Sequence, residues 1–224
     1  MEYDILIKGL RNCNFEELCE DSVEEQVIEN LDYDIYEDSE YGLGATKITI
    51  FPKESEIVVK IPLTHDSYNY NYSEEGIKPF IGAGEPDGWN YCKAENILYE
   101  RAVKADIEYA FLETKLIGRA RGNHPIYIQK KAEMLCERKD SYPKEPEKTQ
   151  KMRTYCKDNY GRYFDAFWLL DFVESYSKDA LQSLFTFLDN NAITDLHEGN
   201  LGYVDNLPVI VDYAGYYETD EGEE

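Results

Sequence analysis

A carboxylate and an amide stand five positions apart near the end of the chain, and a second carboxylate follows them. Asp195 opens the run Asp-Leu-His-Glu-Gly-Asn, which ends at Asn200, and Asp212 follows the apolar run Val-Ile-Val, with Gly215 three residues later. Transfer of a phosphoryl group from a nucleotide needs a group that holds the acceptor hydroxyl and oxygen ligands for Mg²⁺ on the phosphates. The spacing makes Asp195 a candidate catalytic residue, and Asn200 and Asp212 candidate magnesium ligands.

An Asp and an Asn at this spacing are common in loops, so the flanking pattern has to support the interpretation. Residues 201–204 and 209–211 are β-rich runs around a turn at 205–207, which predicts a short hairpin with Asp212 at its end. The run at 178–188 precedes the loop and has its leucines and one phenylalanine on a single helical face. The order of helix, loop, hairpin and carboxylate favours an organised site.

A lysine inside an apolar strand pattern is the next candidate. Residues 57–61 read Ile-Val-Val-Lys-Ile, and because side chains alternate along a strand, Lys60 shares a face with Val58. Burying an ammonium group is costly unless it meets a carboxylate or a phosphate. The alternative is a lysine at a strand edge that reaches solvent.

The carboxylate for Lys60 is expected on the helix that the spacing predicts over 89–105. Glu95 lines up with Leu98 and Ala102 within the apolar stripe of that helix, whereas Glu100 falls on a more exposed face. We therefore expect Glu95 to pair with Lys60 and keep Glu100 as the reserve.

These motifs together resemble the protein-kinase-like superfamily, and the wording of the loop from Asp195 is closest to the aminoglycoside and choline kinases. The resemblance implies ATP and Mg²⁺ as cofactors. It implies that the backbone at Gly42 and Gly44, ahead of the first strand, approaches the phosphates, although a Gly-x-Gly alone is more typical of an ordinary turn. Lys60 and its glutamate would neutralise phosphate charge, and His197 would stabilise the shape of the loop by hydrogen bonding.

The resemblance also implies an α+β fold with two lobes. We expect an N-terminal helical extension over 1–40, with a helix at 22–31. An antiparallel β N-lobe over 41–135 follows, then a reduced helical C-lobe over 136–215 and an acidic tail over 216–224. Runs at 110–118 and 125–129 are expected to complete the N-lobe sheet, with the hinge at 130–136.

Only nine residues follow Gly215, so the resemblance implies a truncated C-lobe. Residues 66–88 are a lid, a partner-binding loop or a passive insertion.

The composition limits the classes of partner. Forty-six acidic residues against 23 basic ones give a net charge of −23, which opposes direct binding to nucleic-acid phosphates. This charge fits a well-solvated surface or a basic protein partner. Five cysteines without CxxC spacing predict a reduced, cytoplasmic protein. The chain has no apolar run of 18 residues and no basic signal-peptide start, so we expect no membrane span.

Three function classes compete on these observations. The first is a compact phosphotransferase, dependent on ATP and Mg²⁺, that acts on a hydroxyl of a small molecule or of a partner protein. The second is a kinase-like nucleotide-binding or pseudokinase interaction module that acts through its acidic surface; the truncated C-lobe and the charge favour it. The third is an acidic decoy, which has no use for a lysine in a strand. The set of Lys60, Asp195, Asn200 and Asp212 favours the first class and leaves the acceptor open.

Overall fold

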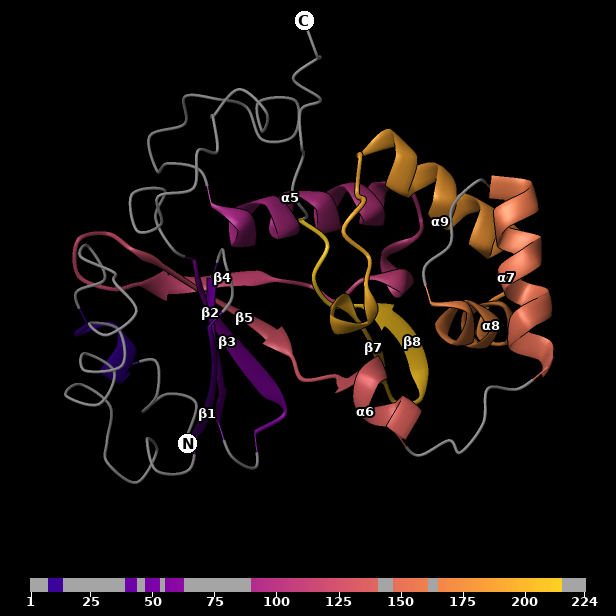
Figure 1. Cartoon of the computed structure of the whole chain (residues 1–224). Helices are drawn as coiled ribbons and strands as arrows, with labels where there is room; N and C mark the ends of the chain where they lie inside the picture. The colour runs from indigo at the N-terminus through magenta and orange to yellow at the C-terminus, as the bar shows by residue number, and fades with distance from the viewer. Residues whose placement is uncertain are drawn as a thin grey trace, which may run out of the picture. The chain divides into compact units, whose positions relative to one another are not determined.

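The computed structural model describes residues 8–13, 39–43, 47–52, 55–62, 90–140, 147–160 and 165–214. These residues form antiparallel sheets and helices, so the fold is α+β (Figure 1). The chain divides into two compact units, the first formed by Met1–Asn96 with Glu113–Lys131 and the second by Ile97–Leu112 with Ala132–Glu224. Within the described part of the chain, every helix is too short or too polar to cross a lipid bilayer.

The first unit is built on a five-stranded antiparallel sheet with the order β1-β2-β3-β5-β4 (Figure 1). β-Branched residues fill its central strands, as the pleated geometry favours. Its strands are β1 (Ser39–Leu43), β2 (Lys47–Pro52), β3 (Ile57–Pro62), β4 (Lys115–Arg119) and β5 (Pro125–Lys130).

The register gives this sheet one apolar face and one face with polar side chains. On the apolar face Ile48 pairs with Ile61, and Val59 pairs with Ile128. On the other face Lys60 pairs with Thr49 on one side and with Tyr127 on the other. The alternation predicted for residues 57–61 is confirmed: Lys60 lies on the face of β3 opposite Val59 and Ile61.

The helix α5 (Tyr91–Lys104) follows β3 along the chain and carries Glu95. Asn90 begins it, because the Lys93 backbone N–H donates to Asn90 Oδ1 at 2.7 Å, a typical N-cap contact. Cys92, Leu98 and Ala102 are buried. The helix predicted over 89–105 is therefore confirmed, and so is the position of Glu95 on its buried side, where the side chain has no exposed surface.

The β4–β5 hairpin is joined to β3 by a buried histidine. His124 Nε2 lies 2.7 Å from the carbonyl oxygen of Pro62, the last residue of β3. Burial lowers the pKa of His124, an effect partly opposed by its hydrogen bond to the Pro62 carbonyl. The neutral imidazole is therefore the form that this fold favours.

The second unit combines a small antiparallel sheet of order β6-β7-β8 with helices (Figure 1). The elements are α6 (Leu135–Asp140), α7 (Glu147–Tyr160), α8 (Ala166–Ser175), α9 (Lys178–Asn190), β6 (Glu133–Met134), β7 (Leu201–Val204) and β8 (Leu207–Ile210). The face predicted to be buried on α9 is buried: Leu181, Leu184, Phe185 and Leu188 are at most 2 % exposed.

The hairpin of β7 and β8 forms where the sequence predicts it. Asp205 and Asn206 have φ angles of 53° and 64°, and Val204 pairs with Leu207, which is the geometry of a two-residue type I′ turn. The indole Nε1–H of Trp168, on α8, donates to the Gly202 carbonyl at 3.2 Å. The Tyr203 hydroxyl donates to Asp171 Oδ2 at 2.8 Å. Two side-chain hydrogen bonds therefore attach β7 to α8.

The structure corrects three of the sequence expectations. Gly42 does not precede the first strand; it lies within β1, opposite Thr49. The strand expected over 110–118 begins only at Lys115, because Phe111 packs instead against Phe187 and Tyr213 in the second unit. The helix α7 was not predicted, since the residues it buries form a narrow stripe of Thr149, Met152 and Cys156 in a polar sequence.

Other expectations fall outside the described residues. These are Gly44, the helix at 22–31, the 66–88 segment and the tail at 216–224.

Candidate functional site

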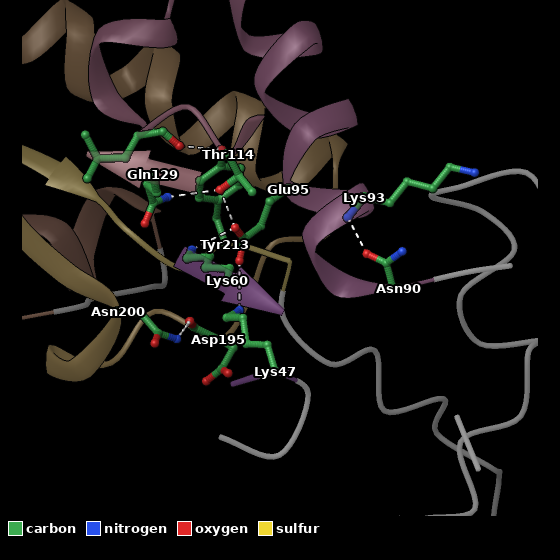
Figure 2. A network of polar contacts seen from close by, with 11 residues as sticks. Lys47, Lys60, Asn90, Lys93, Glu95, Thr114, Gln129, Asp195, Asn200 and Tyr213 are labelled. Carbon is green, nitrogen blue, oxygen red and sulfur yellow. Dashed lines mark hydrogen bonds and ion pairs between the residues drawn. The ribbon is translucent and has the colours of Figure 1, made fainter. Parts of the chain in front are cut away.

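Two lysines and one glutamate form a buried cluster in the first unit, which we call the lysine–glutamate cluster. Lys60 Nζ lies 2.8 Å from Glu95 Oε2, and Lys47 Nζ lies 2.8 Å from Glu95 Oε1. The three residues come from β3, α5 and β2, and each is at most 6 % exposed. Figure 2 shows both ammonium groups directed at the same carboxylate.

The expected ion pair between Lys60 and Glu95 is present, and the alternative of a solvent-exposed lysine is wrong. Glu100, the reserve partner, is exposed. Lys47 is a residue that the sequence analysis missed. It opens β2 directly after residues that read as a glycine-containing turn, so its position in a strand could not be recognised without the register that pairs it with Pro62.

Two further polar side chains support the glutamate. The Thr114 hydroxyl donates to Glu95 Oε2, and the Gln129 side-chain amide donates to that hydroxyl at 3.1 Å (Figure 2). The side chain of Asn96, the next residue of α5, donates to the Thr114 carbonyl at 2.9 Å. Glu95 therefore accepts hydrogen bonds from β2, from β3 and from Thr114, the residue before β4, and its carboxylate is fixed in position from several directions.

The second group of candidate residues lies between the end of α9 and the residues that directly follow β8, and we call it the carboxylate–amide loop (Asp195, Asn200 and Asp212). The Asn200 side-chain Nδ2 donates to the Asp195 carbonyl at 2.7 Å (Figure 2). The Asn200 carbonyl accepts from the Val211 N–H at 2.8 Å and has a long, 3.5 Å contact with the Asp212 N–H. The side-chain amide and the carbonyl of Asn200 therefore connect it to the main chain at both ends of this loop.

His197 and Gly199 shape the interior of the loop. His197 Nδ1 accepts a hydrogen bond from the Gly199 N–H at 3.0 Å, which confirms the expected loop-stabilising role of this ring. His197 Nε2 lies 3.8 Å from Asp195 Oδ1. A Cβ at Gly199 would come within 2.8 Å of the His197 ring, so a side chain at this position would require the exposed imidazole to move.

The exposure of the loop residues differs from that of the lysine–glutamate cluster. Asn200 is 8 % exposed, whereas the Asp195 side chain is 35 % exposed and Asp212 is half-buried. Asp195 can therefore be reached by a substrate. The buried Asn200 is held in place by its hydrogen bond to the Asp195 backbone carbonyl.

The donor set of the loop fits Mg²⁺. The Asn200 amide nitrogen is used by Asp195, which directs the amide oxygen to the opposite side of the planar group as a possible ligand. Asp212 adds a carboxylate two residues after β8. No group of three His, Cys, Asp or Glu side chains in the described ranges forms a metal site by itself. Protein Mg²⁺ sites commonly use one or two carboxylates and complete the shell with phosphates and water.

Comparison of the chain with protein-family models finds no match, and comparison with curated proteins finds no significant similarity. The site residues above therefore rest on their own geometry and chemistry.

Proposed function

We propose that this protein is a compact phosphotransferase, dependent on ATP and Mg²⁺, with a bilobal protein-kinase-like fold. The observation that carries the proposal is the buried ion pair between Lys60 in the third strand and Glu95 in the helix that follows. Protein kinases need such a strand lysine and helix glutamate in place to hold the nucleotide phosphates. The reduced, cytoplasmic setting that we propose is consistent with the four described cysteines, which are thiols and not disulfides.

In this proposal the lysine–glutamate cluster binds phosphate oxygens. Lys60 supplies positive charge, and Glu95 orients its ammonium group, so that little reorganisation is needed when the charge on the transferring group develops. The residues between β1 and β2, which include Gly44, would bring backbone N–H groups to the same phosphates. Gly42 contributes only indirectly, because it is a strand residue.

The carboxylate–amide loop would hold the acceptor and the metal. Asp195 orients the acceptor hydroxyl and accepts its proton, and most of the resulting rate acceleration comes from positioning. Asn200 and Asp212 would hold Mg²⁺, which would neutralise negative charge on the nucleotide phosphates. His197 keeps the loop in shape through the Gly199 N–H. The acceptor is a hydroxyl of a small molecule or of a partner protein.

The test of this proposal is thermal denaturation with and without MgATP. Binding to the folded state raises the melting temperature according to the logarithm of ligand concentration over Kd. We expect a rise with MgATP, a smaller rise with ATP and EDTA, and no MgATP-dependent rise for Asp212→Ala. Asp158→Ala, an exposed carboxylate on α7, is the matched control and should behave as wild type. No shift for wild type at millimolar MgATP would overturn the proposal.

A second candidate is a kinase-like nucleotide-binding or pseudokinase interaction module that acts through its acidic surface. The net charge of −23 favours it, because charge of this size governs association with basic partners. The two candidates differ in turnover. MgATP binding without phosphoryl transfer to water, small hydroxyl compounds or basic proteins would favour the interaction module.

A further inference from the structure

Lys47 is a second buried cation that the proposed function does not require. Its ammonium contacts Glu95 Oε1, while the Lys60 ammonium contacts Glu95 Oε2, both at 2.8 Å. A single carboxylate therefore holds two ammonium groups close to each other. The two lysines come from adjacent strands, because β2 pairs with β3 in antiparallel register.

The register shows that both lysines lie on the same face of the sheet. Lys60 pairs with Thr49, and Lys47 is two residues before Thr49, so their side chains leave the sheet on the same side. Glu95 meets them on that side from α5. The two ammonium groups are thus presented side by side, with their separation set by the two oxygens of one carboxylate.

Stability alone does not explain Lys47. A buried ion pair is often no more stable than apolar side chains of similar volume, because taking charges out of water is costly. A second lysine on the same carboxylate adds another such cost, which an apolar residue in this strand would avoid. A site that uses both ammonium groups to contact an anion accounts for the cost.

We propose that Lys47 is a phosphate-binding residue, and that Lys47 and Lys60 together form a two-ammonium site for the polyphosphate chain of a nucleoside triphosphate. The proposal rests on the proposed function and extends it by naming a residue and a ligand feature. An ammonium group has three N–H donors, so contact with Glu95 is compatible with contact to a phosphate oxygen. Two neighbouring ammonium groups can contact two phosphoryl groups of one chain, which favours tri- and diphosphates over monophosphates.

Binding of inorganic tripolyphosphate, MgATP and AMP to wild type, Lys47→Met and Lys47→Arg, measured by calorimetry, tests this site. We expect Lys47→Met to weaken binding of tripolyphosphate and MgATP at least tenfold and to leave the weaker binding of AMP within about twofold. Lys47→Arg, which keeps the charge, should recover most of the loss. Lys115→Met, an exposed lysine of β4 in the same sheet, is the matched control and should bind as wild type.

Lys47→Met retains the Lys60–Glu95 pair, so it is expected to fold. If it does not, wild-type protein labelled at lysine Cε gives the answer by NMR, with the Lys47 signal assigned from Lys47→Arg. A shift of that signal on addition of tripolyphosphate supports the site, and an unmoved signal at saturation overturns it.

The outcomes separate this inference from the proposed function. If MgATP raises the melting temperature through Asp212 but Lys47→Met binds tripolyphosphate as tightly as wild type, the two-ammonium site is wrong and the phosphotransferase proposal stands. If tripolyphosphate binds through Lys47 but Asp212→Ala leaves the MgATP response intact, the site stands and the proposed metal-dependent function fails. A wild type that binds no polyphosphate overturns the two-ammonium site.

Discussion

The lysine–glutamate cluster and the carboxylate–amide loop solve the problem of positioning charged groups in opposite ways. In the cluster, buried side chains from β2, β3 and α5 bond directly to one another. In the loop, main-chain atoms make the principal contacts, and the Asp195 and Asp212 side chains remain half-buried. Charged groups that are buried and mutually bonded are strongly coupled to folding, whereas partly exposed ones are not.

This difference predicts where stability and function separate. Substitutions in the lysine–glutamate cluster should change both, because each charge there is part of the packed interior. Substitutions of the loop carboxylates should change ligand response with little effect on the unliganded fold.

The largest expected effect is that of Glu95→Gln. It removes the negative charge that two buried ammonium groups contact, and breaking a buried pair in this way costs about 3–5 kcal/mol of unfolding free energy. Urea denaturation followed by circular dichroism measures the loss. Glu100→Gln, exposed on the same helix, should change the unfolding free energy by less than about 0.5 kcal/mol. Equal losses for the two variants would show that the cluster is not coupled to folding.

Asn200→Ala, in the carboxylate–amide loop, is expected to lower the unfolding free energy by less than Glu95→Gln does. The substitution leaves the Asp195 carbonyl without the side-chain donor that it has in the structure, at a cost of about 1–2 kcal/mol. The same denaturation assay applies, with Asn190→Ala, exposed at the end of α9, as the control. If Asn200→Ala destabilised the protein as much as Glu95→Gln, the contrast between the two regions would be lost.

Acid should weaken the first unit through His124. Burial lowers the pKa of this imidazole in the folded state, so the unfolded chain binds the proton first as the pH falls. The unfolding free energy should therefore be insensitive to His124 above its ordinary pKa and decline below about pH 6.5. Urea denaturation at pH 7.5 and pH 5.5 should show a smaller acid-induced loss for His124→Gln than for wild type. An unchanged loss would mean that His124 is not responsible.

The smallest expected effect is a gain in stability when Ala192, which lies between α9 and the carboxylate–amide loop, is replaced by glycine. Its φ angle is 45°, in the left-handed region that favours glycine over a residue with a Cβ. Ala192→Gly should raise the unfolding free energy by about 0.5–1 kcal/mol, a net of relieved backbone strain and added unfolded-state entropy. The gain should come without a change in MgATP response. A loss of stability would mean that the strain at this position is negligible.

The sequence was sufficient to predict elements and neighbouring residues where the pattern was local or periodic. Asp195, Asn200 and Asp212 lie in one short run, and a recognisable hairpin sets their order. The Lys60–Glu95 pair could be predicted from two periodicities, the alternation of a strand and the apolar stripe of a helix. The buried face of α9 followed from the same reasoning.

The remaining features of the fold and of the candidate site depend on contacts between residues that are far apart in the sequence. Lys47 opens a strand after residues whose sequence is typical of a turn, and only the pairing of β2 with β3 places it beside Lys60. Thr114 and Gln129 join the cluster through contacts that span 19 and 15 positions in the chain. Phe111 reads as a strand residue, but its ring packs with Phe187 and Tyr213, so packing overrides its local preference for a strand.

The hydrogen bond from Trp168 to Gly202 has a spectroscopic consequence. The indole is fully buried, and its N–H bonds to a carbonyl two residues after Asn200. The chain has two tryptophans, so Trp89→Phe leaves Trp168 as the one tryptophan, whose emission depends on this hydrogen bond and on the apolar side chains around the ring. The emission wavelength of this variant would report on movement of β7, and hence on events at the carboxylate–amide loop, without an added label.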